Sequence, residues 1–120
     1  MEKTASDLMR GNLDLMVLSS LSGGAKYGYL IQQSVGEATG GLVAIQAGTL
    51  YPLLHRLEAA GLVRGRWDHS TERKRKWYEL TAAGHKCLKH QADQWREYVE
   101  CLGRMLAPVL GRPCASLGGA

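Results

Sequence analysis

The segment from residue 46 to residue 84 constrains the fold most, because its hydrophobic pattern changes from helical to strand-like and back. Its first part has leucines at i, i+3, i+4 and i+7, a spacing that predicts one buried face of a helix. These leucines are Leu50, Leu53, Leu54 and Leu57. Gly61 is placed to end the helix, and residues 62–68 and 76–80 then have the composition of strands. We therefore expect a helix followed by a two-stranded hairpin.

Positive charge is concentrated in the expected hairpin. Between residues 64 and 76 there are six basic residues and two acidic ones, whereas the whole chain of 120 residues has a formal net charge of only +4. Cationic side chains on a hairpin can bind phosphates, although a solvated charged turn has the same composition. An amphipathic helix beside such a hairpin is typical of a winged-helix DNA-binding protein. The predicted fold class is mainly α with a small β-hairpin (α+β), a winged helix-turn-helix domain followed by a C-terminal dimerisation helix.

The helix face away from the leucines carries the side chains that we expect to contact double-stranded DNA. They are Gln46, Thr49, Tyr51, Pro52, His55 and Arg56. Gln46 is a candidate N-cap, and the first backbone N–H groups of the helix would face the same partner. Pro52 has no long side chain and permits contact with a thymine methyl group, whereas His55 and Arg56 can hydrogen-bond to bases or phosphates. Tyr51 is equally suited to closing the edge of the core.

Two further regions supply candidate DNA contacts. The hairpin, or wing, contributes Arg73, Lys74, Arg75 and Lys76, and the alternation of side chains along a strand turns about half of these toward DNA. Tyr29, near the start of an earlier helix, can either place its hydroxyl on a phosphate or fill the core. The binding surface is thus expected to combine one helix, the wing and the start of a second helix.

Two helices are expected before this segment. The first has Asp7 as its N-cap and ends at residues 22–24, and the second spans Tyr27–Thr39 and ends before two glycines. Residues 42–45 are apolar and partly β-branched, which predicts a short strand that pairs with the hairpin. The winged-helix domain is therefore expected to occupy residues 1–80 and to be ordered from about residue 8.

A last helix is expected over residues 81–107, with Thr81 as its N-cap and Pro108 as its limit. Its apolar residues are alternately four and three positions apart, a period of about 3.5 that is typical of a coiled-coil seam. The seam consists of Leu88, Ala92, Trp95, Val99, Leu102 and Leu106. The helix could simply fold back over the first helix, but we expect both kinds of contact, with the first helix and the seam packing together across the two-fold axis of a homodimer. Residues 108–120 are rich in Gly, Pro and Ala and are expected to be disordered.

Trp95 is bulky for a tightly packed seam. Across a two-fold axis, two indole rings would line a hydrophobic gap that is suited to a flat, apolar effector. The alternative is a tryptophan that packs tightly and binds nothing.

Other functional classes have little support in the sequence. No catalytic set, phosphate loop or zinc-ligand spacing is present, so we expect neither an enzyme nor a cofactor. No apolar run is long enough to span a membrane and the first residues include acids, so a cytoplasmic location is expected. Cys87 and Cys101 can share a helix face, which leaves a redox-responsive DNA-binding regulator as one alternative. A second alternative is a winged helix that binds an acidic protein through its basic hairpin.

Four motifs in this order resemble the PadR family of bacterial transcriptional regulators, particularly its branch with a short C-terminal helix. They are GNLDLMVLSSL at residues 11–21, YGYLI at 27–31, GTLYPLLHRLEAAGLV at 48–63 and RKWYELTAAG at 75–84. The resemblance covers about residues 8–107. It implies a dimeric winged helix that binds a palindromic promoter site, usually as a repressor that a phenolic or hydrophobic small molecule releases.

The resemblance also implies particular site residues. The family's DNA contacts correspond to Tyr29, Gln46, Thr49, Tyr51 and residues 73–76, and its effector pocket would lie in the dimer interface near Trp95. The chain departs from the family pattern at Tyr27, where a His is usual, and at residues 70–72, where the wing usually has a Gly. These departures affect the phosphate contact beside Tyr27 and the conformation of the wing tip, but not the charge of the wing.

Overall fold

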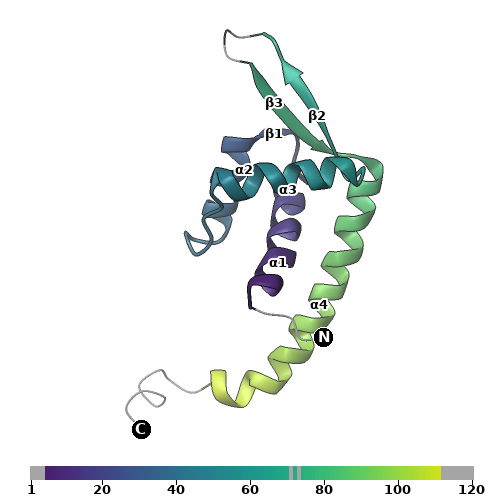
Figure 1. The fold of residues 1–120 in the computed structure, drawn as a ribbon. Helices are drawn as coiled ribbons and strands as arrows, with labels where there is room; N and C mark the ends of the chain where they lie inside the picture. Colours follow the sequence, from purple (N-terminus) through teal and green to yellow (C-terminus); the bar gives the residue numbers. More distant parts are fainter. Residues whose placement is uncertain (1–4, 71, 73, 112–120) are drawn as a thin grey trace. The chain divides into compact units, whose positions relative to one another are not determined.

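The structure, a computed structural model, describes residues 5–70, 72 and 74–111, with side chains from residue 12 onward. Its elements are, in order, α1 (Ala5–Ser20), β1 (Lys26–Tyr27), α2 (Gly28–Ala38), α3 (Ala47–Ala59), β2 (Val63–Asp68), β3 (Arg75–Leu80) and α4 (Ala82–Leu110) (Figure 1). The chain divides after Lys89, so the first turns of α4 belong to the winged-helix unit and the rest of α4 to a second unit. The predicted fold class, a winged helix followed by a long C-terminal helix, is confirmed.

The core of the first unit joins three helices to a small sheet. The helix α1 packs on α2, α2 packs on α3, and α3 lies against β2. The four leucines predicted to be buried on α3 are all buried, and they share the core with α1, α2 and the sheet. Leu88, from the start of α4, packs against this core. The hairpin formed by β2 and β3 extends beyond the three helices (Figure 1), which leaves it free to contact a partner.

The helix α3 begins and ends where the sequence predicts. Gln46 has extended backbone (φ −81°, ψ 155°), and Gly61 has φ +77°, a left-handed conformation that residues with a side chain rarely adopt. Gln46 therefore occupies the N-cap position, but its side chain makes no capping hydrogen bond. Its backbone carbonyl instead accepts the N–H groups of Thr49 and Leu50, at 3.0 and 2.9 Å.

The third strand of the sheet is not the one that the sequence suggests. Residues 42–45 form no strand, whereas β1 pairs antiparallel with β3 and gives the strand order β1-β3-β2. The segment is held by α2 instead, because Val43 N–H donates to Thr39 Oγ1 (3.1 Å) and Gln32 Nε2 donates to the Ile45 carbonyl (2.8 Å). Leu42 is 87% exposed, whereas Ile45 is buried in the core and Val43 packs against it, so the apolar composition of the segment reflects packing on the core without strand pairing.

Both terminal helices differ from the prediction at their ends. The helix α1 starts at Ala5, so Asp7 lies within it and is not its N-cap. The helix α4 starts after Thr81, whose Oγ1 accepts the Gly84 N–H (3.0 Å) as expected of an N-cap. It continues through Pro108 to Leu110, although a proline inside a helix removes one backbone hydrogen bond and its ring crowds the carbonyl four residues before it. The predicted disorder of residues 108–120 is thus wrong for 108–110, and residues 112–120 lie outside the described residues.

Candidate nucleic-acid interface

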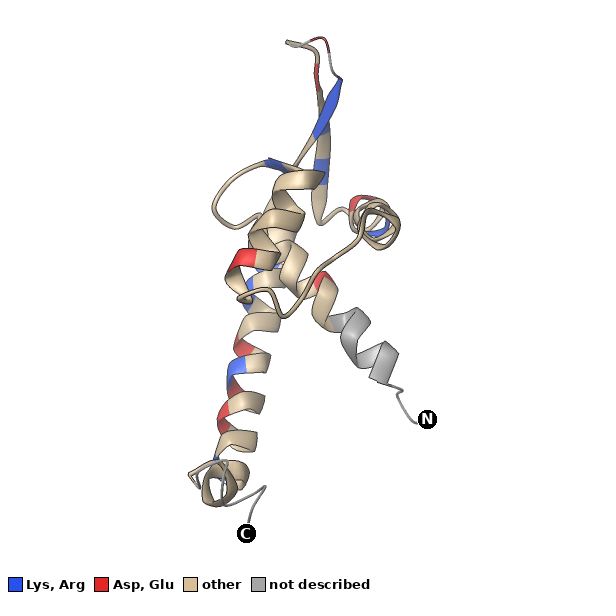
Figure 2. Cartoon of the chain, turned by 90° about the vertical axis from the view of Figure 1, so that its left-hand side faces the viewer, with Lys and Arg blue, Asp and Glu red and all other residues tan. Residues whose placement is uncertain are grey.

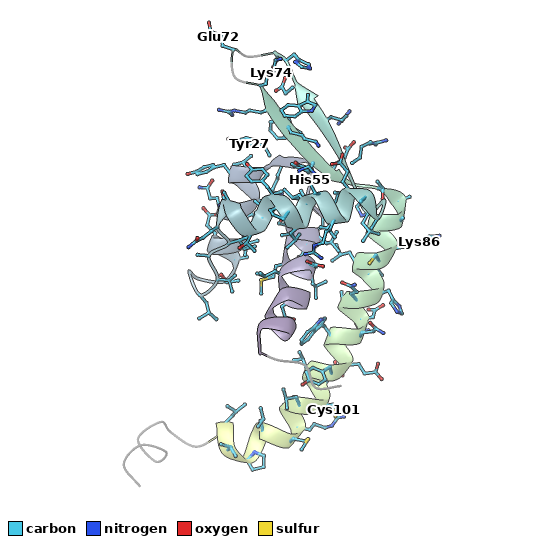
Figure 3. The ribbon with its side chains drawn as sticks, viewed as in Figure 1. Tyr27, His55, Glu72, Lys74, Lys86 and Cys101 are labelled. Atoms are coloured by element: carbon cyan, nitrogen blue, oxygen red, sulfur yellow. The ribbon has the colours of Figure 1, made fainter. Side chains whose placement is uncertain are left out.

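The exposed side of α3 and the wing border one groove of about 420 Å³. Its walls combine aromatic side chains, including those of Tyr51 and Trp67, with the cationic side chains of residues 74–76. Figure 3 shows Tyr27 and His55 near the base of the hairpin and Lys74 toward its tip. Figure 2 shows Lys and Arg on the hairpin strands. The structure therefore brings two residues of the predicted helix face, Tyr51 and His55, together with wing residues 74–76, whereas the other predicted residues of that face do not line the groove.

The predicted contact residues on α3 are all exposed. They are Gln46, Thr49, Tyr51, Pro52, His55 and Arg56. Within the part of the chain that the structure describes, Arg56 is the one among them with an ion pair, since its Nη2 lies 3.3 Å from Asp14 Oδ1 on α1. An exposed pair of this kind contributes little and is easily exchanged for another partner. The others leave a surface on α3 that a nucleic acid can approach.

The structure shows how exposed Tyr29 and Tyr51 are, the two tyrosines that the sequence could assign either to the core or to DNA contact. Tyr29 is 62% exposed, so it does not fill the core and its hydroxyl is accessible. The Tyr51 ring lies over the start of α2, where a Cβ added at Gly28 would overlap its hydroxyl group. Tyr51 nevertheless remains exposed and lines the groove, so it both closes the edge of the domain and faces the candidate site.

The wing cations differ in what holds them. Arg73 lies outside the described residues, and Lys74 is exposed. The guanidinium carbon of Arg75 lies 4.7 Å from the centroid of the Tyr27 ring, within the range of a cation–π interaction. Lys76 is different, because its Nζ lies 3.0 Å from Glu58 Oε1 on α3 and its side chain is only 21% exposed. The structure thus gives Lys76, predicted as a DNA contact, an internal partner.

Two carboxylates organise the wing. The hydrogen bond from Lys76 lowers the pKa of Glu58, and the Gly65 N–H, which donates to Oε2 at 3.2 Å, lowers it further, although burial opposes both. The pKa of Asp68 is lowered chiefly by hydrogen bonds from the Ser70 hydroxyl (2.6 Å) and the Ser70 N–H (2.9 Å). Asp68 therefore supports a turn at the wing tip, where the resemblance leads one to expect a Gly.

Sequence reasoning missed the internal pairing of the wing. Glu79 accepts from both Arg64 (2.9 Å) and Arg66 (3.3 Å), and neither arginine lines the groove. The strand register, which places Arg64 opposite Glu79, is the sequence signal that could have revealed the first pair. Glu79 therefore offsets one of the two positive charges that Arg64 and Arg66 add to the hairpin.

The predicted seam residues fall in both units of the chain. Leu88 packs against the winged-helix core, whereas Ala92, Trp95, Val99, Leu102 and Leu106 are exposed in the second unit. The Trp95 and Tyr98 rings meet edge to face, with centroids 5.4 Å apart. Tyr98 and Met105 are also exposed, so the apolar surface is broader than the predicted seam. This exposed surface of α4 is unusually apolar for a solvated helix.

A three-helix core that carries an exposed helix face beside a cationic hairpin defines the class of winged helix-turn-helix DNA-binding proteins. Residues 17–90 match the transcriptional regulator PadR-like family, and the chain belongs to that family. The resemblance drawn from the four motifs is therefore confirmed. Members of this family are transcriptional regulators, which also confirms that the chain is not an enzyme.

Several relatives share most of the chain. An uncharacterised protein of Lysinibacillus sphaericus is 33% identical over 98 residues, which cover 81% of this chain and 90% of that protein. A transcriptional regulator from Clostridium thermocellum is 31% identical with a TM-score of 0.74, covering 82% of this chain and 96% of its own. A PadR family transcriptional regulator from Eggerthella lenta is 36% identical with a TM-score of 0.71, and the match covers 84% of this chain and 87% of that protein. The 98 residues shared with the Lysinibacillus sphaericus protein exceed the 89 residues of the winged-helix unit, so the similarity is not confined to that unit.

Bacillus subtilis PadR, whose crystal structure is a complex with operator DNA, is 27% identical with a TM-score of 0.62. The match covers 68% of this chain and 46% of that protein, which is therefore considerably longer than the shared region.

Among the described residues of this chain, no helix is long and apolar enough to cross a membrane.

Proposed function

We propose that the chain is a transcriptional regulator that binds double-stranded DNA as a homodimer, with α3 in the major groove and the wing on the phosphate backbone. The observation that carries the proposal is the groove, because Tyr51 and His55 of α3 line it together with the wing cations of residues 74–76. The similarity to Bacillus subtilis PadR, which has been crystallised with operator DNA, supports the same partner. The bases would be contacted from the first half of α3 and the phosphates from the wing.

Within this proposal, the position of each exposed residue indicates which part of the DNA it would contact. Gln46, Thr49 and Pro52 occupy the exposed start of α3, where free backbone N–H groups add to an anion-binding end. His55 lies further along α3 and lines the groove, so it is placed to contact either a base or a phosphate. Tyr29 would donate its hydroxyl to a phosphate beside the wing.

The dimer would be formed by the exposed apolar residues of α4. The side chains of Trp95, Val99, Leu102 and Leu106 repeat with the seam period, and a second copy of the same helix is the partner that this period fits. A two-fold dimer would place two copies of α3 on an inverted repeat in a promoter, where binding represses transcription. An apolar effector would bind between the two copies of Trp95 and change the spacing of the two reading helices.

The salt dependence of DNA binding tests this proposal. If each protomer neutralises three phosphates through Arg73, Lys74 and Arg75, log K should fall with log salt at a slope of about −5 for the dimer. The measurement is a fluorescence anisotropy titration of a labelled duplex at several salt concentrations. A slope shallower than about −2, or weak binding to every duplex at low salt, would contradict the proposal and favour a wing that binds an acidic protein.

A further inference from the structure

Glu58 joins α3 to both strands of the wing. It lies in the last turn of α3, where Oε1 accepts from Lys76 Nζ on β3 (3.0 Å) and Oε2 accepts from the Gly65 N–H on β2 (3.2 Å). The Glu58 carboxylate, which belongs to the helix that would read DNA, therefore accepts hydrogen bonds from both strands of the wing. We call Glu58, Lys76 and Gly65 the wing joint.

The wing joint is more shielded than the other ion pairs between described elements. The Glu58 and Lys76 side chains are 32% and 21% exposed, whereas the arginines that pair with Asp14 and Glu79 are each more than half exposed. A shielded pair with two charge-assisted hydrogen bonds is less weakened by solvent than a surface pair. It is therefore suited to fixing the geometry of two elements.

The surroundings of Lys76 hold its ammonium group in the joint. Nζ lies 5.8 Å from the Trp67 ring centroid and 5.4 Å from the Tyr78 ring centroid, so aromatic rings border it as well as Glu58. Gly65 leaves the space that the lysine stem needs, because a Cβ there would overlap Lys76 Cε and lie 3.1 Å from Glu58 Oε2. The position of the Lys76 side chain thus depends on the missing side chain of Gly65, which lies within a strand and not in a turn.

We propose that Glu58 is a positioning residue that sets the wing against α3, and that Lys76 serves this joint and makes no phosphate contact. The inference rests on the proposed DNA-binding function, and it changes which wing residues bind the backbone. Lys76 neutralises the carboxylate that would otherwise repel a nearby phosphate, and the phosphate contacts fall to residues 73–75. The distance between the base-reading helix and the phosphate clamp is then fixed before DNA binds.

The joint itself can be tested in the free protein. In Glu58→Ala the Gly65 amide loses its acceptor, and its hydrogen exchange should accelerate by about tenfold or more, as expected for a hydrogen bond to a charged group. Glu58→Gln retains an oxygen acceptor and should have a smaller effect. The exchange of amides in the α1–α2 core serves as the control for global unfolding. Equal exchange at Gly65 in wild type and Glu58→Ala would overturn the joint.

The role of Lys76 can be tested on a random-sequence duplex of about three helical turns. Lys74→Met is the matched control, because Lys74 is exposed and its loss should flatten the log–log salt slope by about 1.8 for a dimer. Lys76→Met retains the aliphatic stem beside Trp67 and Tyr78 and should leave the slope unchanged. Lys76→Met and Glu58→Gln should each weaken DNA binding a few-fold. The variant that combines both substitutions should lose no more DNA affinity than either single variant.

Each outcome separates this inference from the proposed function. If Lys76→Met flattens the slope as much as Lys74→Met, or if the two losses multiply in the double variant, Lys76 contacts phosphate and the inference is wrong. If the wild type binds no duplex even at low salt, the proposed function fails and the inference fails with it. Thermal unfolding followed by circular dichroism confirms that each variant is folded at the temperature of the titration.

Discussion

At the scale of single residues, the wing cations differ because each has a different neighbour. Lys74 is exposed, Arg75 lies against the Tyr27 ring, and Lys76 pairs with Glu58. A count of basic residues treats these three as equivalent, although their availability to a phosphate differs. The sequence predicted the region of positive charge correctly, but it could not predict the pair between Glu58 and Lys76, which are 18 positions apart and meet only in the folded chain.

Tyr27 should present Arg75 to DNA. Its ring contacts the Arg75 guanidinium and also meets the Trp77 ring edge to face, with centroids 5.0 Å apart, so the arginine lies on a supported surface. Tyr27→Leu should weaken DNA binding about two- to fivefold, the equivalent of an exposed cation–π interaction, whereas Tyr27→Phe should have little effect. Equilibrium binding of both variants is compared in the wild-type and Arg75→Ala backgrounds. The same loss from Tyr27→Leu in both backgrounds would show that the ring does not act through Arg75.

Glu58 should make the stability of the domain depend on pH. Its pKa in the folded chain is below the ordinary value of 4.5, so its stabilising contribution is fully present above that value and is lost as the pH falls through the folded pKa. The difference in the free energy of unfolding between wild type and Glu58→Gln should therefore shrink in acid. Urea unfolding of both proteins over a series of pH values measures this difference. A difference that stays constant from neutral pH into the acid range would contradict the prediction.

At the scale of elements, helices with a clear buried face were predictable and short pairings were not. The four leucines of α3 predicted its buried face, and Thr81 and Gly61 marked helix ends correctly. The strand β1 has two residues, which is too short for an alternating pattern, whereas residues 42–45 have strand composition without pairing. The groove follows from tertiary packing, so the sequence predicted most of its residues without predicting their arrangement.

The exposed apolar surface of α4 should be the dimer interface. Leu102→Glu places a charge in the middle of the predicted seam and should convert the protein to a monomer at micromolar concentration, because an unpaired buried charge is costly. Glu100→Lys changes an exposed charge off the seam and is the matched control. Sedimentation equilibrium measures the mass of each variant. A dimer that persists in Leu102→Glu would show that this surface does not hold the two copies together.

Loss of the dimer should not unfold the winged-helix unit. Leu102 lies in the second unit and takes no part in the core of buried residues. The far-UV circular dichroism of Leu102→Glu should therefore retain the melting transition of the winged-helix core. DNA affinity should fall nevertheless, since a monomer can contact only one half-site.

At the scale of the whole molecule, the account depends on two surfaces in different units of the chain. The groove between α3 and the wing would contact one half of a DNA site, and the apolar surface of α4 would bring a second copy to the other half. Either surface alone is compatible with other functions, such as binding an acidic protein or packing within a larger assembly. Together they predict a specific arrangement of the DNA sequence.

Selection of bound sequences from a random duplex pool, using the full chain, tests this arrangement most directly. The account predicts an inverted repeat whose half-sites are centred about one helical turn apart, because a two-fold dimer presents two copies of α3 to one side of the duplex. Recovery of a single half-site, or of no common sequence at all, would contradict a dimeric regulator that reads DNA with α3.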